Sequence, residues 1–278
     1  MVQIGTETGT DPGPTAPSGI TRRPRRVTSG RGFGVDIGGS GIKAAPVDLA
    51  TGALTADRVR VDTPVPSTSA AVTQAVADVV RSFGSAVGRR PIGVTFPAVI
   101  QHGVARTAAN VDASWVDTDI DAVMTAGLGR PVHVVNDADA AGVAEARYGA
   151  ARGVRGVVLM ATLGTGIGTA LLLDGQLVPN TELGHLELDG KDAEIRAAAS
   201  AREREDLDWP TYARRLQRYF GALENLLWPD LIVVGGGVSR KSEKFLPLLR
   251  LRTPIVPAAL RNGAGIIGAA LLAAEFGN

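Results

Sequence analysis

The stretch FGVDIGGSGIKAAPVDLATG, residues 33–52, is an apolar run that breaks at a glycine-rich turn, resumes, and ends at a second turn rich in Asp and Gly. A third apolar run follows as far as Val61. Runs of β-forming residues separated by such turns are typical of antiparallel hairpins. The stretch therefore predicts three strands, over 33–37, 42–47 and up to residue 61, joined as an antiparallel meander.

The same pattern returns in VVLMATLGTGIGTALLLDGQLV, residues 157–178. Asp36 in the first stretch corresponds to Thr162 in the second, at an offset of 126 residues, and Gly38 corresponds to Gly164. Repetition at a fixed offset indicates an internal duplication. We therefore expect two related lobes, each opening with a hairpin.

Outside these stretches, helical and buried-strand patterns alternate along the chain. Apolar residues recur at helical spacing, and short continuous apolar runs between polar residues indicate buried strands. The fold class is therefore α/β. We expect helices over 69–83, 138–148, 209–227 and 266–274, and strands over 92–96, 132–135 and 231–234.

The composition excludes several classes of protein. A length of 278 residues favours two compact lobes over one. Hydrophobic residues make up 45% of the chain, enough for a core, and no apolar run approaches the roughly 18 residues of a membrane span. The formal charge of +1 gives no bulk attraction to nucleic acid or to an anionic membrane. Without cysteine there is no disulfide, thiol nucleophile or Cys-ligated zinc.

Residues 1–31 are rich in Gly, Pro, Thr and Ser, which predicts a disordered tail. The arginines near its end are not followed by the apolar stretch of a twin-arginine export signal, so we expect a cytoplasmic protein. We assign 32–136 to a small N-terminal lobe and 137–263 to a large C-terminal lobe. The closing helix, within 264–278, is expected to return to the first lobe.

The glycine turns at 38–41 and 164–166 suit phosphate binding. Backbone N–H groups reach a phosphate oxygen only where no Cβ intervenes and a positive φ is available. The alternative for each turn alone is a tight hairpin with no ligand. As a pair in matching frames, the turns favour a phosphoryl transferase, which must stabilise charge on the transferred group from several sides.

Polar residues follow a predicted strand at Asn136 and Asp137. Ligands of open α/β sheets bind at the carboxyl ends of strands. The carboxylate of Asp137 would there either cap the following helix or accept the proton of an attacking hydroxyl.

A second polar group comprises Glu182, His185, Glu187 and Glu194, and it is too polar for a core. Soft ligands for a metal are missing, so we favour contacts to a polyhydroxylated substrate. Asn110 is a further candidate contact, with a simple turn residue as the alternative.

The turn Gly235-Gly236-Gly237 follows a predicted strand and resembles a phosphate-facing turn. Basic residues come soon after it, and they form either a solvated surface or a track for a polyanion. They are Arg240, Lys241, Lys244, Arg250 and Arg252.

Four motifs, in order, resemble those of the ROK family of sugar kinases and repressors. They are Asp36-Ile37-Gly38-Gly39-Ser40, Leu163-Gly164-Thr165-Gly166-Ile167-Gly168, Glu182-Leu183-Gly184-His185 and Val234-Gly235-Gly236-Gly237-Val238. Segments 109–115, 179–182 and 228–230 resemble the actinobacterial polyphosphate glucokinases of that family, which include polyphosphate/ATP glucomannokinases. The likeness runs from about residue 32 to residue 275, nearly the whole chain beyond the tail.

The resemblance implies an actin-like, ribonuclease-H-like fold of two lobes around a cleft, and a homodimer. It implies transfer of phosphate from polyphosphate, and also from ATP, to the 6-hydroxyl of glucose. Asp137 would be the base and Asp36 would orient Mg²⁺. Sugar contacts are implied at Asn110, Asn136, Glu182, His185 and Glu194, and phosphate contacts at Gly38, Gly39, Ser40, Lys43, Thr165, Gly166, Gly235 and Gly236.

The chain departs from the wider family at the sugar loop. Most members follow the Gly-His pair with a Cys-rich zinc motif, whereas this chain has Gly184-His185 and no cysteine. No zinc is therefore expected, and His185 is available to the sugar. ROK repressors carry an N-terminal helix-turn-helix, but the 35 residues before Asp36 show no helical pattern, so DNA binding is not expected.

Three alternatives to a polyphosphate glucokinase stay open. They are a strictly ATP-dependent glucokinase, a kinase for another hexose such as mannose, and a sugar-sensing protein without catalysis. Asp137 favours catalysis over sensing, because sugar binding alone does not demand it.

Overall fold

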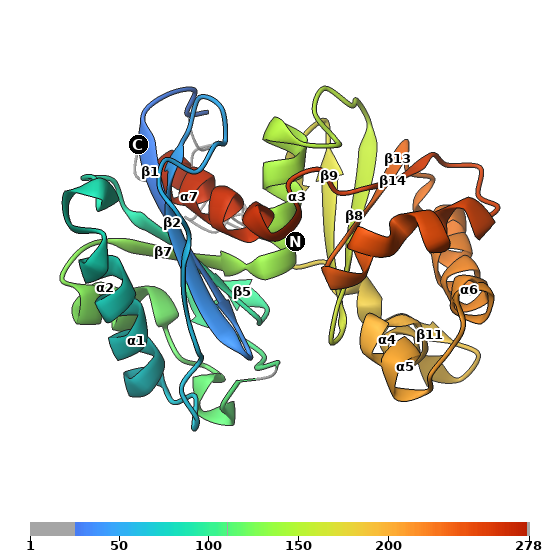
Figure 1. The fold of residues 1–278 in the computed structure, drawn as a ribbon, viewed down its shortest axis with the longest axis horizontal. Coiled ribbons are helices and arrows are strands. Elements are labelled where there is room, and N and C mark those ends of the chain that lie inside the picture. Colours follow the sequence, from blue (N-terminus) through green and yellow to red (C-terminus); the bar gives the residue numbers. More distant parts are fainter. Residues whose placement is uncertain (1–25, 110, 277–278) are drawn as a thin grey trace, which may run out of the picture.

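The computed structural model describes residues 26–109 and 111–276, and these form two β-sheets with helices between and around them (Figure 1). The first sheet has the strand order β3-β2-β1-β4-β7, and the second has the order β10-β9-β8-β13-β14. The first comprises β1 (Arg31–Gly38), β2 (Gly41–Asp48), β3 (Val59–Val61), β4 (Ile92–Phe96) and β7 (Val132–Asn136). The second comprises β8 (Val157–Leu163), β9 (Ile167–Leu173), β10 (Gln176–Val178), β13 (Leu231–Gly235) and β14 (Ile255–Pro257).

Both predicted meanders are confirmed, because β1–β2–β3 and β8–β9–β10 are antiparallel and the remaining strands join in parallel. The equivalent strand order in the two sheets supports the internal duplication. The hairpins differ in register by one residue. Gly38 pairs with Gly41, which leaves a loop of two residues, whereas Leu163 pairs with Ile167, which leaves a loop of three.

The predicted helices are confirmed with small shifts at their ends. The described residues also include three helices that the sequence patterns do not predict, namely α2 and the short α4 and α5. In α2 only Ile120 and Met124 of the nine residues are buried, so its apolar pattern is weak. The helices are α1 (Ser69–Ser82), α2 (Ile120–Leu128), α3 (Asp137–Tyr148), α4 (Ala193–Ala197), α5 (Ala199–Arg204), α6 (Trp209–Leu227) and α7 (Ala264–Phe276). Short 3₁₀ helices are η1 (Gly84–Val87), η2 (Ala113–Trp115), η3 (Leu183–His185), η4 (Gly237–Lys244), η5 (Leu246–Leu248) and η6 (Arg261–Gly263). Two small hairpins pair β5 (Ile100–Gln101) with β6 (Val104–Ala105), and β11 (Glu187–Leu188) with β12 (Lys191–Asp192).

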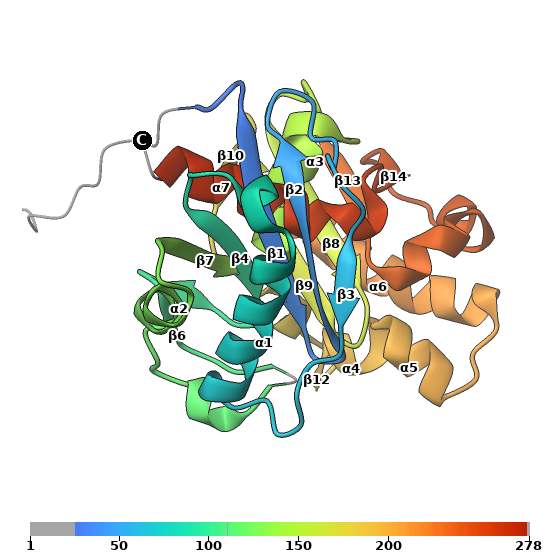
Figure 2. The same ribbon diagram turned by 60° about the vertical axis from the view of Figure 1, so that its left-hand side comes forward.

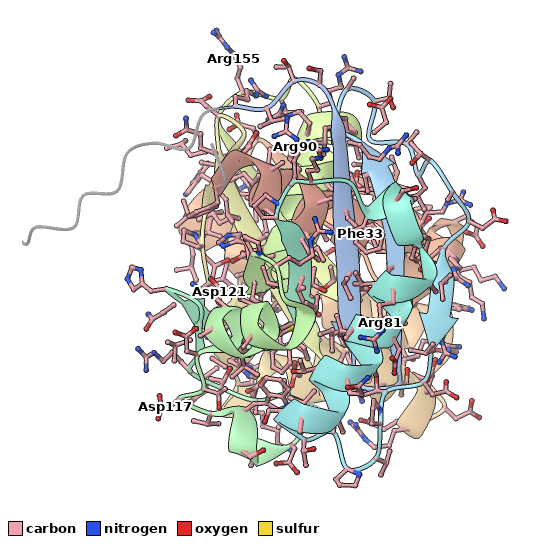
Figure 3. All side chains as sticks on the ribbon, turned by 90° about the vertical axis from the view of Figure 1, so that its left-hand side faces the viewer. Phe33, Arg81, Arg90, Asp117, Asp121 and Arg155 are labelled. Atoms are coloured by element: carbon pink, nitrogen blue, oxygen red, sulfur yellow. The ribbon has the colours of Figure 1, made fainter. Side chains whose placement is uncertain are left out.

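Buried side chains form three clusters. The first lies between the first sheet and helices α1 and α2, which cover its outer face (Figure 2). Phe33 belongs to this cluster and packs edge-on against Phe83, whereas Arg155 projects from the surface (Figure 3). The second cluster surrounds α3 and α7, and the third packs α6 against the second sheet. In the described part of the chain, no helix has the length and apolar character needed to cross a membrane.

Part of the segment predicted to be a tail, residues 26–31, belongs to the described structure. Val27 is buried, its N–H donates to Glu275 Oε1 (3.1 Å), and its carbonyl accepts from Arg147 Nη1 (2.9 Å). β1 already begins at Arg31. Of the predicted tail, residues 1–25 lie outside the described residues. The predicted boundary at 136/137 falls where β7 gives way to α3, and α7 packs on β1 and β4 of the first sheet as well as on α3.

α7 lies in backbone contact with elements on both of its sides. A Cβ at Gly34 in β1 would lie 1.9 Å from the carbonyl oxygen of Ile266, and a Cβ at Gly93 in β4 would lie 1.9 Å from that of Ala269. A Cβ at Gly268 would lie 1.8 Å from the carbonyl oxygen of Ala140 in α3. Only glycine permits this approach, so the three glycines fix α7 between the first sheet and α3.

This packing predicts that Gly34→Ala lowers the free energy of unfolding by about 2 kcal/mol or more, because the new methyl group meets backbone that cannot move aside. Gly221→Ala is the matched control. Its Cβ would meet only Gln217 Nε2 at 3.8 Å within α6. Alanine there should raise stability by about 0.5–1 kcal/mol through its higher helix propensity. Urea denaturation midpoints of both variants measure the difference, and similar midpoints would contradict the proposed role of the contact.

Candidate active site

Polar side chains meet where the parallel strands of the first sheet end. β1 runs parallel to β4 with Asp36 opposite Thr95, and β7 lies beyond β4. The Asp36 carboxylate accepts hydrogen bonds from Thr95 Oγ1 (2.8 Å) and from Lys43 Nζ (3.1 Å). With 19% of its side chain exposed, Asp36 is held in a fixed orientation and stays accessible.

The sequence left two functions open for Asp137, capping of the following helix and acceptance of a proton. In the structure Asn136 performs the first of them. Asn136 caps α3, because its Oδ1 accepts from the N–H groups of Ala138 (2.8 Å) and Asp139 (3.1 Å). Its Nδ2 donates to the carbonyl of Ala98 (3.0 Å). Since Asn136 supplies the cap, the partly buried carboxyl of Asp137 is available for another function.

The carboxyl of Asp137 lies within the electrostatic reach of two other acids. Burial, followed by the negative charge of Asp36 and a smaller contribution from Glu182, raises the pKa of Asp137 to about 6. Hydrogen bonding to the Ala138 N–H opposes this shift. A carboxyl group that is mainly ionised at neutral pH and close to its pKa can accept a proton during a reaction.

Asp139 is a buried acid that the sequence analysis did not single out. Its side chain is 3% exposed, Oδ2 accepts from the backbone N–H of Asn180 (2.9 Å), and Oδ1 has no partner among the described residues. Burial, with smaller contributions from Glu182 and Asp137, raises the pKa of Asp139 to about 7. The only sequence signal was its position two residues after Asp137.

Asn180 joins the two halves of the molecule beneath the candidate site. Its side chain bonds both backbone groups of Ile100 in β5: Oδ1 accepts from the N–H (2.9 Å) and Nδ2 donates to the carbonyl (2.8 Å). Its own N–H donates to Asp139. Asn180 has φ +59°, a left-handed conformation that asparagine tolerates better than most residues. The sequence placed Asn180 in a motif but assigned it no function.

The predicted sugar contacts Glu182, His185 and Glu194 lie close together. His185 Nδ1 is 2.8 Å from Asp192 Oδ2, and this bond is the main cause that raises the pKa of His185. Burial is the main cause that raises the pKa of Glu182, with Glu194 adding to it and His185 opposing it. Glu194 Oε2 accepts from the Ile167 N–H (2.8 Å), beside the turn between β8 and β9.

The second glycine turn and the Gly235–Gly237 turn lie side by side. Gly235 pairs with Thr162, and Gly236 has φ +79° with its Cα so close to β8 that a Cβ would be 2.2 Å from the Leu163 carbonyl. Ser200 fixes the 164–166 turn, because its N–H donates to the Gly164 carbonyl (3.1 Å) and its Oγ to the Thr165 carbonyl (2.5 Å).

The turn at 38–40 is tied to β3 and the segment after it. Arg60 Nη2 donates to the carbonyl of Ser40 (2.9 Å), and Thr63 Oγ1 donates to the carbonyl of Gly38 (2.5 Å). Gly39 and Ser40 are exposed. The predicted phosphate contacts thus occupy two places, this turn with Lys43 nearby, and the paired turns of the second sheet.

The basic residues after Gly237, predicted to form either a solvated surface or a track for a polyanion, do not lie together in one continuous track. Lys241 and Lys244 place their Nζ atoms 6.0 and 5.8 Å from the ring of Trp209, at the start of α6. Arg252 lies over the ring of Trp228, just beyond the end of α6. Arg250 is bonded through its backbone N–H to Gln217. The predicted contact Asn110 lies outside the described residues.

Among residues 26–109 and 111–276, no three His, Asp or Glu side chains are close enough to bind a metal ion by themselves. Mg²⁺ at phosphoryl-transfer sites is bound through one or two carboxylates together with substrate phosphates. The repelling carboxylates of Asp36 and Asp137 fit that requirement, because a divalent cation would relieve their repulsion.

The chain is similar to known proteins over nearly its whole length. Residues 32–206 match the ROK family. The polyphosphate glucokinase of Mycobacterium tuberculosis is 51% identical over 272 residues, which cover 98% of this chain and 97% of the relative.

Solved structures give the same result. The inorganic polyphosphate/ATP-glucomannokinase from Arthrobacter sp. strain KM is 59% identical to this chain and superposes with a TM-score of 0.84. The aligned region covers 88% of this chain and 98% of the Arthrobacter protein. The ROK hexokinase from Thermus thermophilus is 28% identical over 87% of this chain and 97% of its own, with a TM-score of 0.70. The predicted actin-like, ribonuclease-H-like α/β fold is confirmed by these neighbours.

The bridge from Asn180 to Ile100 predicts that Asn180→Ala lowers the free energy of unfolding by about 1–3 kcal/mol, because it removes two hydrogen bonds and places alanine at a positive φ. Asn225→Ala is the control. Asn225 is exposed on α6 and makes a single side-chain bond to Arg252. Its loss should change stability by less than about 0.5 kcal/mol. Equal effects of the two substitutions in chemical denaturation would show that the bridge is not stabilising.

Proposed function

The chain belongs to the ROK family, and from this membership we propose that it transfers a phosphoryl group from inorganic polyphosphate, and also from ATP, to the 6-hydroxyl of glucose. The relatives that support the donor and the sugar are the mycobacterial polyphosphate glucokinase and the Arthrobacter polyphosphate/ATP-glucomannokinase. High identity over nearly the full length of both supports carrying the reaction class to this chain.

The observation that carries the proposal is the environment of Asp137. It is the first residue of α3, Asn136 supplies the cap, and burial together with the charge of Asp36 raises its pKa to about 6. In the proposed reaction, the Asp137 carboxylate accepts the proton of the sugar 6-hydroxyl as that oxygen forms a bond to the terminal phosphorus. The bond from this phosphorus to the next phosphate breaks, and the donor leaves one phosphate shorter.

We propose that Glu182, His185 and Glu194 bind the other sugar hydroxyls. The bond from Asp192 to His185 Nδ1 leaves Nε2 to contact a hydroxyl, and the raised pKa of His185 favours its donor form. Asn136 can offer only its Nδ2 group, because Oδ1 is occupied by two backbone bonds. Asn110 stays a predicted contact.

We propose that Asp36, with Asp137 nearby, holds Mg²⁺, and that Lys43 and the turns at 38–40, 165–166 and 235–236 contact the phosphates. When bound, the cation neutralises charge on the transferred group. Lys43, now paired with Asp36, is placed to turn toward a phosphate oxygen. The backbone N–H groups of the glycine turns offer bonds that require no side chain.

Several finer features stay predictions. Mannose as a second substrate, a homodimer and a cytoplasmic location are expected from the sequence and the resemblance. ATP as a donor is supported by the name of the Arthrobacter relative.

The first test is glucose 6-phosphate formation by the purified protein with Mg²⁺ and glucose, with polyphosphate or ATP as the sole donor. We expect turnover with both. Turnover with ATP alone would contradict the proposed donor and leave a strictly ATP-dependent glucokinase. Absence of turnover with both, with glucose still bound, would favour a sugar-sensing protein.

The second test is the pH dependence of kcat/KM. Because the base must be ionised, kcat/KM should rise about tenfold per pH unit below pH 6 and level off above it. Asp137→Asn should lower kcat by about 10²–10⁴-fold while glucose still binds.

Asp139→Asn is the control for the pH profile. Burial raises the pKa of Asp139 to about 7, but its Oδ2 accepts from the Asn180 backbone, so its replacement should leave the acid limb in place. A limb that disappears in Asp139→Asn, or an Asp137→Asn variant that no longer binds glucose, would contradict the function assigned to Asp137.

A further inference from the structure

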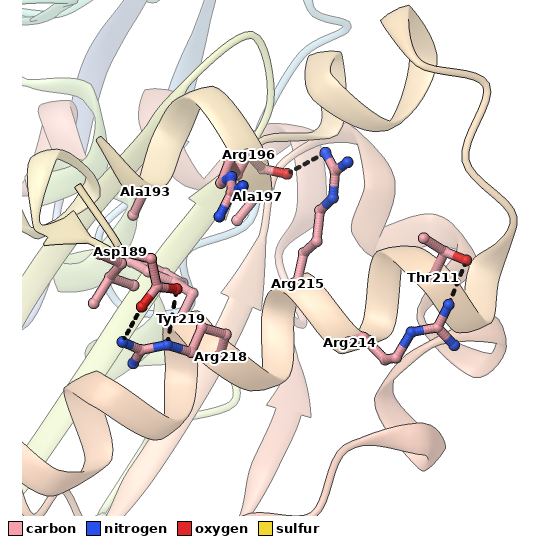
Figure 4. Close-up of a pocket in the computed structure, with 10 residues that line it drawn as sticks. Asp189, Ala193, Arg196, Ala197, Thr211, Arg214, Arg215, Arg218 and Tyr219 are labelled. Carbon is pink, nitrogen blue, oxygen red and sulfur yellow. Dashed lines mark hydrogen bonds and ion pairs between the residues drawn. The ribbon is translucent and has the colours of Figure 1, made fainter. Parts of the chain in front are cut away.

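Four arginine side chains line a cavity of about 320 Å³ between α4 and α6. Arg196 comes from α4, and Arg214, Arg215 and Arg218 come from α6 (Figure 4). Asp189, at the turn between β11 and β12, is the one acid in the lining. We call this cavity the arginine pocket. Neither the sugar site nor the phosphate turns include any of its residues.

Only part of the positive charge in the arginine pocket is neutralised. Arg218 bonds Asp189 through Nε (3.2 Å) and Nη2 (2.8 Å), and Arg215 Nη2 bonds Glu205 (2.5 Å). Arg214 donates to Thr211 Oγ1 (2.8 Å) and makes no close ion pair in the described part of the chain, although its charge acts on Asp208. Arg196 likewise makes no close ion pair among the described residues, although its charge acts on Asp189. Four arginines thus face few carboxylates, and the pocket keeps a net positive charge.

This arrangement is costly without a ligand. Arg214 and Arg218 are four residues apart on α6 and lie about 6 Å apart along its axis, where like charges repel. An exposed helix face rich in arginine is normally solvated and flat. Here the side chains border a hollow between α4 and α6, which a solvated surface does not explain.

The chemistry of the pocket selects phosphate groups. Guanidinium groups bind phosphate oxygens through paired N–H donors, and several of them together suit a ligand that carries several negative charges. A neutral sugar would gain nothing from the net positive charge.

The arginine pocket and the cleft share α4. Ala193, Arg196 and Ala197 line the pocket, while Asp192, which caps α4, bonds His185. Glu194 in the same helix binds the Ile167 N–H beside the phosphate turn. α4 therefore connects the lining of the pocket to the residues proposed to contact the sugar and the phosphates.

We propose that the arginine pocket binds a distal stretch of the polyphosphate chain while its terminal phosphoryl group lies in the cleft. This inference rests on the proposed function. It predicts that the pocket acts only on donors long enough to reach both places, and that ATP does not use it.

The test replaces the two lining arginines that make no close ion pair, as Arg196→Gln with Arg214→Gln, and so leaves the ion pairs of Arg215 and Arg218 intact. Arg89→Gln with Arg155→Gln removes the same charge from exposed positions outside the pocket. Lys241→Gln with Lys244→Gln removes it from the cluster around Trp209. Initial rates are compared with polyphosphate of about one hundred phosphates, with tripolyphosphate and with ATP, and thermal melting confirms folding.

We expect the pocket variant to raise KM for the long chain by roughly fivefold or more, with KM for tripolyphosphate and ATP within about twofold of wild type. An unchanged KM for the long chain would overturn the proposal. An equal rise for tripolyphosphate or ATP would also overturn it, in favour of a site for small phosphate anions. A loss confined to the lysine variant would overturn it by placing the chain at Trp209.

Equilibrium binding separates failure of the pocket from failure of the proposed function. Titration calorimetry of the long polyphosphate at several salt concentrations requires no turnover. The pocket variant should bind more weakly, and its log–log salt slope should fall by about one to two relative to wild type. If wild type does not phosphorylate glucose from polyphosphate, the proposed function fails, and this binding difference still decides on the pocket. Identical binding by wild type and the pocket variant would overturn it.

Discussion

The backbone contact of α7 with its neighbours is the constraint on which the geometry of the site depends. Gly34 and Gly93 let α7 lie against β1 and β4, and Gly268 lets α3 lie against α7. Asp36 lies near the end of β1 and Asp137 begins α3, so the same helix sets the separation of the two acids. Its first turn also touches one of them, because a Cβ at Gly265 would lie 3.1 Å from Asp36 Oδ1. Close-packed backbone transmits small shifts directly, so a change in this packing displaces the acids.

The acids gathered at the cleft impose an electrostatic cost that serves the chemistry. Burial is the main cause that raises the pKa of Asp137 and of Asp139, and the charges of Asp36 and Glu182 add to it at Asp137. Groups of this kind are typical of functional sites, because a base must have a pKa near the working pH. The same negative charge repels a polyanionic donor. Attraction of such a donor therefore has to come from Lys43, from backbone N–H groups and from cationic side chains outside the cleft.

Sequence patterns predict those parts of this molecule that depend on local periodicity and turn chemistry. The two meanders and the long helices follow from alternation and helical spacing, and the carboxyl-end rule predicted that Asn136 and Asp137 lie at the site. Asp139 and Asn180 could not be assigned, because their importance arises from hydrogen bonds between segments 41 and 80 residues apart in the chain. The basic residues after Gly237 lie close together in sequence, but the two ends of α6 separate them in space. Likewise, the arginine pocket gathers residues from α4 and α6 that no sequence spacing links.

The two duplicated hairpins differ in the charge of their corresponding side chains and in the length of their loops. In the first hairpin Asp36 lies opposite Lys43, and the loop has two residues. The corresponding positions in the second hairpin are Thr162 and Thr169, which are neutral, and the loop has three residues. A second carboxylate at Thr162 would have added negative charge beside the turn, where phosphates are proposed to bind. The three-residue loop presents the N–H groups of Thr165 and Gly166, because that of Gly164 donates within the loop to the Gly166 carbonyl (2.9 Å). The first hairpin therefore combines a carboxylate suited to a cation with Lys43 and a turn suited to phosphate, whereas the second relies mainly on backbone N–H groups.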